Sequence, residues 1–121
     1  MKLITSIRET NGVAIVDISG KIVLGEESAA LRTVVSDLLG KGRKKILFNL
    51  GKVNYIDSSG LGFLVSAFAT VKKQGGELKL LNLTSNVQDV MQMTKLYTIF
   101  DVLNDEGVAV ESFGHAILAN A

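Results

Sequence analysis

Residues 45–62 read KILFNLGKVNYIDSSGLG, and this stretch decides the fold. Its first part, residues 46–50, is almost continuously apolar and too short for a helix. Such a run predicts a central β-strand that is buried on both faces. From Ser58 to Gln74 the apolar residues recur at helical spacing, so a helix is expected to follow. A strand that leads into a helix is the repeating unit of α/β folds.

The residues upstream predict an opening hairpin and one more helix. Residues 2–8 and 13–18 show strand character, and Asn11-Gly12 between them favours the tight turn of a β-hairpin. Apolar residues then recur at helical spacing over residues 31–39, and a glycine at position 40 or 42 is placed to end that helix.

The residues downstream continue the alternation of strands and helices. Residues 77–83 are expected to form a strand, and Ser85 with Gln88 resembles a capping box that opens the next helix. Residues 97–100 predict a short edge strand, and residues 104–118 a final helix. The fold class is therefore α/β, with a mixed sheet, an opening hairpin and helices packed on the sheet.

The composition fits a single folded domain over residues 1–121, with 47% hydrophobic residues. Thirteen Lys and Arg against twelve Asp and Glu give a net charge of +1, which provides no overall attraction to nucleic acid or anionic lipid. The absence of cysteine excludes thiol catalysis, disulfides and thiolate metal sites. No apolar run approaches the roughly 20 residues that span a bilayer. A cytoplasmic protein without membrane insertion is expected.

A hydrolase is disfavoured by the surroundings of its best nucleophile. A nucleophile elbow needs glycine two residues before and after the serine, whereas Ser58 has Ile56 and Gly60. The only histidine, His115, lies in an alanine-rich terminal stretch, where a surface side chain is the simpler interpretation.

Nucleotide and metal motifs also fail. Gly20 and Gly25 have P-loop spacing, but Glu26-Glu27 stands where Gly-Lys should follow. Gly60-Leu61-Gly62 begins a dinucleotide fingerprint whose third glycine position holds Val65. The scattered carboxylates show no metal-ligand spacing, so neither a cofactor nor a metal is expected.

The one basic cluster consists of Lys41, Arg43, Lys44 and Lys45. No aromatic residue is interleaved for base stacking, and cations at this place favour the C-terminus of the preceding helix. A solvated loop is therefore preferred over nucleic-acid contact.

The segment Asp57-Ser58-Ser59-Gly60-Leu61-Gly62 carries the functional signal. Asp57 or Ser58 can act as the helix N-cap, which is worth about 1 kcal/mol. Gly60 and Gly62 are both expected in the first turn, where each costs roughly 0.8 to 1.0 kcal/mol relative to alanine. We interpret these glycines as leaving the helix end bare for the close approach of another molecule.

A serine hydroxyl at such a helix end is expected to be exposed. A phosphoryl group there lies at the positive end of the helix dipole, so it should not unfold the domain. It adds about −1.5 to −2 charges and opposes any partner that must desolvate this patch of glycine, Leu61 and backbone. Ser58 and Ser59 are both in the first turn, and physics alone does not choose between them.

Residues 57–62 match a known phosphorylation-loop motif, and residues 44–50, 75–78 and 91–100 match the blocks that flank it. On these residues the chain resembles the STAS domain family, and within it the bacterial anti-sigma factor antagonists, over roughly residues 2–115. The resemblance implies a protein that switches partners and is not an enzyme. In its unphosphorylated form it binds an anti-sigma factor that is also an ATP-dependent serine kinase, which releases the sigma factor. Phosphorylation would end the binding, and a metal-dependent serine phosphatase would then remove the phosphoryl group.

Carried onto this sequence, the resemblance makes Ser58 the phosphoacceptor, with Ser59 as the secondary candidate and Asp57 shaping the loop. The implied partner-binding residues are Asp57, Ser58, Ser59, Gly60, Leu61, Gly62, Gly25 and Glu26. The chain departs from the family near Val23, where an aspartate is common. The alternative is a STAS domain that does not switch but docks within a stress-sensing complex or a lipid-transport system.

Overall fold

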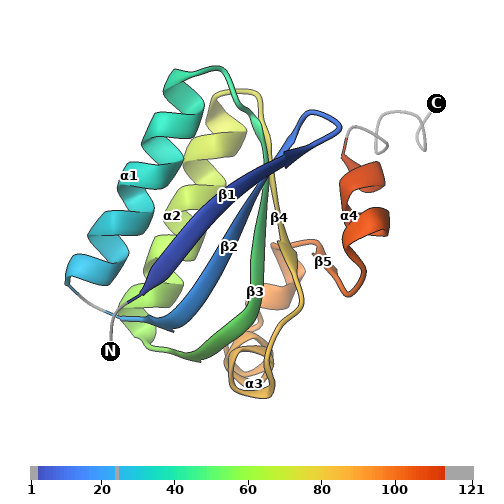
Figure 1. Cartoon of the computed structure of the whole chain (residues 1–121). Helices are drawn as coiled ribbons and strands as arrows, with labels where there is room; N and C mark the ends of the chain where they lie inside the picture. The colour runs from blue at the N-terminus through green and yellow to red at the C-terminus, as the bar shows by residue number, and fades with distance from the viewer. Residues whose placement is uncertain (1–2, 24, 114–121) are drawn as a thin grey trace.

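The computed structural model describes residues 3–23 and 25–113 of the chain (Figure 1). Its elements are β1 (Ile4–Thr10), β2 (Val13–Ile22), α1 (Glu26–Gly40), β3 (Lys45–Ile56), α2 (Ser58–Lys73), β4 (Glu77–Leu81), α3 (Ser85–Thr94), the 3-10 turn η1 (Leu96–Thr98), β5 (Val102–Leu103) and α4 (Glu106–Ser112). The strands form one sheet in the order β1-β2-β3-β4-β5.

The sheet is mixed, as the sequence predicts. β1 pairs antiparallel with β2, whereas β2, β3, β4 and β5 pair in parallel. Thr10 lies opposite Val13, so Asn11 and Gly12 form a two-residue loop, and both have positive φ angles of 51° and 80°. Positive φ at both positions is what a type I′ hairpin turn requires. The α/β class and the opening hairpin are confirmed.

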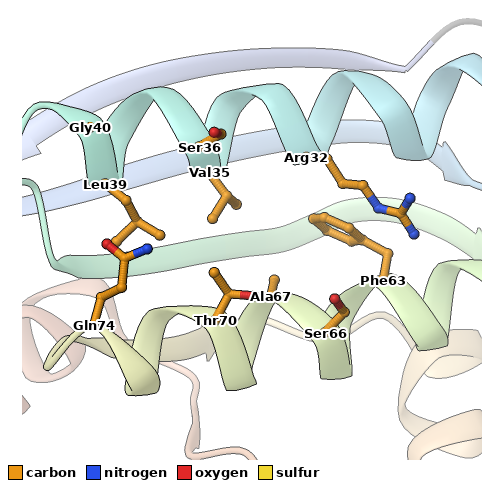
Figure 2. A pocket seen from close by; sticks show the side chains of 10 residues that line it. All are labelled: Arg32, Val35, Ser36, Leu39, Gly40, Phe63, Ser66, Ala67, Thr70 and Gln74. Atoms are coloured by element: carbon orange, nitrogen blue, oxygen red, sulfur yellow. The ribbon is translucent and has the colours of Figure 1, made fainter.

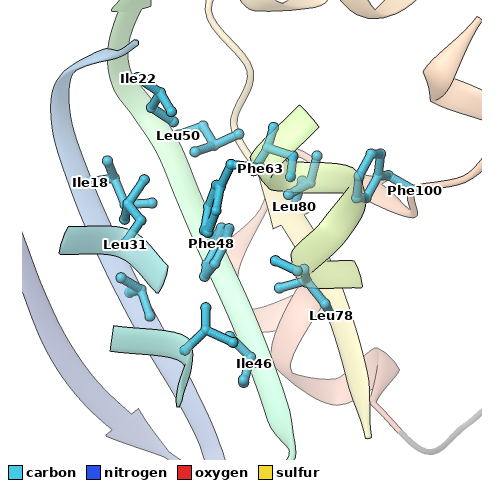
Figure 3. Close-up of a cluster of buried hydrophobic side chains, with 14 of the residues drawn as sticks. Ile18, Ile22, Leu31, Ile46, Phe48, Leu50, Phe63, Leu78, Leu80 and Phe100 are labelled. Atoms are coloured by element: carbon cyan, nitrogen blue, oxygen red, sulfur yellow. The ribbon is translucent and has the colours of Figure 1, made fainter. Parts of the chain in front are cut away.

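The main core lies between the sheet and three helices. Figure 1 shows α1 and α2 side by side against one face of the sheet, and α3 adds Val87 and Met91 to the same core. Alternate residues of the inner strands point into it, among them Ile18, Phe48 and Leu80 (Figure 3). These three side chains are at most 2% exposed. Burial of such apolar side chains is the main stabilising contribution to folding.

Helix α4 covers part of the opposite face of the sheet. The smaller cluster there consists of Val13, Ile15, Leu47, Leu81, Ala109, Val110 and Phe113. Lys79 is buried beside it, and its Nζ donates hydrogen bonds to the carbonyl and hydroxyl oxygens of Ser112, both at 2.9 Å. Leu47 is thus buried on one face of β3 and Phe48 on the other, which confirms the prediction of a strand covered on both sides.

The edge strand was placed too early by the sequence. Residues 97–100 were expected to form it, but Leu96–Thr98 is a 3-10 turn and the strand is Val102–Leu103, paired with Leu80–Leu81. Phe100 is only 4% exposed. Of the apolar residues in this range, Phe100 therefore packs in the core, whereas Tyr97 and Ile99 are exposed.

The capping box expected for α3 does not form. Thr84 occupies the N-cap position, so Ser85 is the first helical residue. No side chain caps the helix, because the Thr84 hydroxyl instead donates to the carbonyl oxygen of Val53 at 2.6 Å. The prediction was wrong by one residue because the N-cap threonine is used to attach α3 to β3.

Helix α4 is shorter than the range 104–118 that the sequence predicts. Asp105 is its N-cap, and its carboxylate accepts a hydrogen bond from the Val108 backbone N–H at 2.9 Å. The helix ends at Ser112, and the rest of the predicted range, with His115, lies outside the described residues. Within the described residues, no helix has the length and apolar character that crossing a membrane requires.

Arg8 joins α4 to the hairpin through two carboxylates. Its guanidinium donates to both carboxylate oxygens of Asp17, at 2.6 and 2.9 Å, and to those of Glu106, at 3.1 and 2.8 Å. Asn49 donates to Asp17 as well, at 2.8 Å. The hydrogen bonds from Arg8 lower the pKa of both carboxyl groups below their usual values.

This network predicts acid sensitivity. The pKa values of both carboxyl groups are lowered on folding, so their ion pairs with Arg8 contribute to the free energy of unfolding above about pH 4 to 5. This contribution is lost as the pH falls through the pKa values of the folded state. We expect Arg8→Gln to lower the free energy of unfolding at pH 7 by about 0.5 to 2 kcal/mol, as two partly exposed ion pairs suggest. Urea denaturation of both proteins at pH 7 and pH 3 should show a smaller difference at pH 3.

Arg32→Gln is the control, because Arg32 is exposed and makes no ion pair with a described residue. An Arg8 effect that is equal at both pH values contradicts this account.

Candidate functional site

The candidate site lies where β3 passes directly into α2. The strand ends at Ile56, the helix begins at Ser58, and Asp57 is the single residue between them. Asp57 has extended backbone, with φ −101° and ψ −177°, and its Oδ1 accepts a hydrogen bond from the Gly60 backbone N–H at 2.8 Å. The sequence left Asp57 and Ser58 as alternative caps, and the structure selects Asp57.

The two serines differ in exposure. Ser58, the first residue of the helix, is exposed, whereas Ser59 is half-buried. The first turn of a helix presents backbone N–H groups without intrahelical acceptors and the positive end of the helix dipole. Ser58 is therefore exposed to solvent at a helix N-terminus, where an added anion is electrostatically favourable.

Gly60 is required by packing inside the molecule. A Cβ on this residue would overlap the carbonyl oxygen of Ile22 and would lie 2.7 Å from Cγ1 of Ile56. The same Ile22 oxygen accepts a hydrogen bond from the Asp57 N–H at 3.3 Å. The interpretation that Gly60 leaves the helix end bare for a partner is therefore wrong: this glycine brings the start of α2 against the end of β2.

Leu61 and Gly62 have opposite surroundings. Leu61 is 8% exposed and belongs to the main core. The sequence analysis placed its side chain in an open patch, and that prediction is wrong. Gly62 is exposed, and a Cβ placed on it would meet no atom within 4 Å. Of the predicted segment, Ser58 and Gly62 are exposed, Asp57 and Ser59 are half-buried, and Gly60 and Leu61 are buried.

Gly25 lies at the same edge of the sheet. Ile22, at the end of β2, pairs with Ile56, at the end of β3, so the segments that follow the two strands leave the sheet together. Gly25 is exposed, has a φ of 112° and is the N-cap residue of α1. Glu26 begins that helix, and its side chain lies outside the part of the structure that is described.

Two residues beside the site were missed by the sequence analysis. Lys21 and Tyr55 are paired across β2 and β3, one step before Ile22 and Ile56. The Nζ of Lys21 lies 5.8 Å from the centre of the Tyr55 ring, and Tyr55 is 44% exposed. No motif marks either residue, because their proximity depends on the register between the strands.

A groove of about 410 Å³ between α1 and α2 lies outside this segment (Figure 2). Val35, Leu39 and Phe63 contribute apolar side chains to it, and Arg32 reaches past Phe63 toward the start of α2. None of the residues from Asp57 to Gly62 lines the groove.

The basic cluster lies at the other end of β3. Arg43 forms an ion pair with Glu9, and the Lys44 carbonyl oxygen accepts a hydrogen bond from the Glu77 N–H at 2.8 Å. β3 starts at Lys45 and ends at Ile56, so about 35 Å of strand separates this cluster from Ser58. Among the described residues, no group of three or more His, Asp or Glu side chains is arranged to hold a metal ion.

Comparison with known proteins gives one family. The STAS domain family model matches residues 5–109. The anti-sigma-B factor antagonist of Bacillus subtilis is 37% identical over 81 residues, which are 67% of this chain and 61% of that protein. The matched region thus spans about three fifths of that relative's length.

Solved structures show the same fold. The crystal structure of the protein TM1081 from Thermotoga maritima superposes with a TM-score of 0.81 at 26% identity, covering 88% of this chain and 92% of that one. The Bacillus cell fate determinant SpoIIAA in its phosphorylated form gives a TM-score of 0.70 at 19% identity, over 89% of this chain and 97% of that one. The latter likeness concerns the fold alone.

The two glycines at the start of α2 give a matched test of this geometry. We expect Gly60→Ala to lower the free energy of unfolding by about 1 to 3 kcal/mol, because the added methyl group must displace the end of β2. Gly62→Ala fills open space and restores helix propensity, so it should raise stability by up to about 1 kcal/mol. Urea denaturation of both variants beside the wild type measures the two changes. Equal effects of the two substitutions would show that the Ile22 contact does not constrain Gly60.

Proposed function

This chain belongs to the STAS domain family, and we propose that it is an anti-sigma factor antagonist that is switched off by phosphorylation of Ser58. Unphosphorylated, it binds an anti-sigma factor that is also a serine kinase, and a sigma factor is released. The proposal is supported by the anti-sigma factor antagonists among its relatives. The observation that carries it is the exposed Ser58 at the Asp57-capped start of α2.

Ser58 is the better acceptor because a kinase must bring its hydroxyl in line with the γ-phosphate of ATP. An exposed side chain at the first helical position allows that approach, whereas Ser59 is half-buried. In the transfer, the Ser58 Oγ–phosphorus bond forms while the bond from the γ-phosphorus to the β,γ-bridging oxygen breaks. ADP leaves, and the hydroxyl proton passes to a base of the kinase. This chain is the substrate and performs no catalysis.

Phosphorylation should release the partner through charge and bulk. The phosphoryl group adds about −1.5 to −2 charges at pH 7, next to the small surface of Gly62. Any partner that had desolvated this surface must then bury part of an anion, which is unfavourable. A metal-dependent serine phosphatase would hydrolyse the Oγ–phosphorus bond with water and restore the hydroxyl. We place the cycle in the cytoplasm, where the transcription machinery operates.

Affinity capture from a native lysate tests the switch. We expect the wild-type chain and Ser58→Ala to retain an ATP-binding serine kinase, identified by mass spectrometry. Ser58→Asp should bind it at least about tenfold more weakly, a loss of about 1.4 kcal/mol or more. Incubation of the wild type with the recovered kinase and Mg-ATP should add one phosphoryl group, and the Ser58→Ala variant should stay unmodified.

Two controls separate this outcome from misfolding and from other functions. An acidic residue near a helix N-terminus is favourable, so the free energy of unfolding of Ser58→Asp should lie within about 0.5 kcal/mol of the wild-type value. Ser59→Asp places the same charge one residue away and tests whether the position matters. Recovery of the same transporter or sensory complex by the wild type and by Ser58→Asp would contradict the switch and favour a docking subunit.

A further inference from the structure

Lys21 and Tyr55 form an exposed pair beside the segment of residues 57–62. They are cross-strand partners in the parallel pair of β2 and β3. The Lys21 ammonium lies 5.8 Å from the ring centre of Tyr55, within the range of a cation–π interaction. Lys21 is exposed and Tyr55 is 44% exposed, so a charge and an aromatic surface are both open to another molecule.

The pair is held in a fixed position relative to Ser58. The next residue pair along the strands, Ile22 and Ile56, is buried, and the Ile22 carbonyl oxygen accepts the Asp57 N–H. Contact of the same oxygen with Gly60 seats α2 against the end of β2. The contacts of Ile22 with Asp57 and Gly60 therefore form a rigid junction between β2 and α2. This junction fixes the backbone positions of Lys21, Tyr55 and Ser58 relative to one another.

Lys21 and Tyr55 point to the face of the sheet that is away from α1 and α2. Side chains alternate along strands, and Ile22 and Ile56 point into the main core. Helix α4 packs on this other face against Val13, Ile15, Leu47 and Leu81, which lie toward the opposite ends of the strands or on β4. The surface beside Ser58 is thus free of α4.

Among the side chains that the structure describes, which do not include those of Glu26 and Glu27, no carboxylate forms an ion pair with Lys21. Lys52 on β3 instead lines a groove with Asp17, and its charge helps to lower the pKa of the Asp17 carboxyl group. A cation over an exposed aromatic ring is suited to a carboxylate, since the ring buries apolar surface and the ammonium supplies the opposite charge.

We propose that Lys21 and Tyr55 are a second contact point for the partner, and that the partner presents an Asp or Glu carboxylate to Lys21. This inference rests on the proposed function and identifies the chemistry of the partner's surface. It also adds a cause of release. A phosphoryl group on Ser58 would repel the partner's carboxylate, because both are anions at the same end of β2 and β3.

The test uses the kinase recovered with the wild-type chain, purified and titrated by calorimetry. Lys21→Glu should weaken binding at least about tenfold, and Lys21→Met should weaken it less, because it removes the attraction without adding repulsion. Tyr55→Ala should weaken binding about fivefold or more by removing aromatic surface. Lys73→Glu makes the same charge change in the last turn of α2, far from Ser58, and should leave affinity within about twofold.

Salt dependence and stability complete the design. The wild-type affinity should fall as salt is raised, and Lys21→Met should show a shallower slope, because one ion pair is missing. Each variant must unfold in urea close to the wild type, so that a loss of binding is not a loss of fold. Equal weakening by Lys21→Glu and Lys73→Glu would indicate a general charge effect and overturn the inference.

The outcomes separate this inference from the proposed function. If Ser58→Asp loses the kinase while Lys21→Glu binds like the wild type, or more tightly, the carboxylate contact is wrong and the switch stands. If the wild-type chain captures no serine kinase, the proposed function is wrong and the inference falls with it.

Discussion

The carbonyl oxygen of Ile22 is the point on which the functional end of the molecule depends. It accepts the Asp57 N–H, and it lies so close to Gly60 that no side chain fits there. These contacts join the end of β2 to the start of α2 through backbone atoms, which cannot adjust as flexible side chains do. The position of Ser58 is therefore set by the register of the sheet and not by the loop alone.

The sequence predicts features that depend on neighbours in the chain and misses those that depend on distant partners. The buried strand, the Asn11-Gly12 turn and a cap at Asp57 follow from local patterns. The true reason for Gly60 does not, because it lies in an atom 38 residues away. The early placement of the edge strand has the same origin: Phe100 is apolar because it packs in the core, and a local pattern does not distinguish a core contact from a strand.

The candidate site follows the same division. Exposure of Ser58 could be anticipated from its place at a helix start, whereas the burial of Leu61 and the proximity of Lys21 to Tyr55 required the packed structure. The basic cluster, which the sequence analysis interprets as a solvated loop, lies at the opposite end of β3 from Ser58. Lys41 and Lys44 follow the C-terminal end of α1, where positive charge offsets the negative end of the helix dipole, and Arg43 is engaged by Glu9.

A rigid junction also determines how a modification at Ser58 can act. A phosphoryl group at the first residue of α2 is favoured by the helix dipole, and the Asp57 cap lies on the backbone beneath it. Because the helix dipole favours an anion at this position, the added charge is not expected to rearrange the fold. Its effect must therefore appear at the surface, in what a partner gains or loses by covering Ser58. A switch of the proposed kind needs no second conformation of its own, since a change of charge at Ser58 is enough to alter which partner binds.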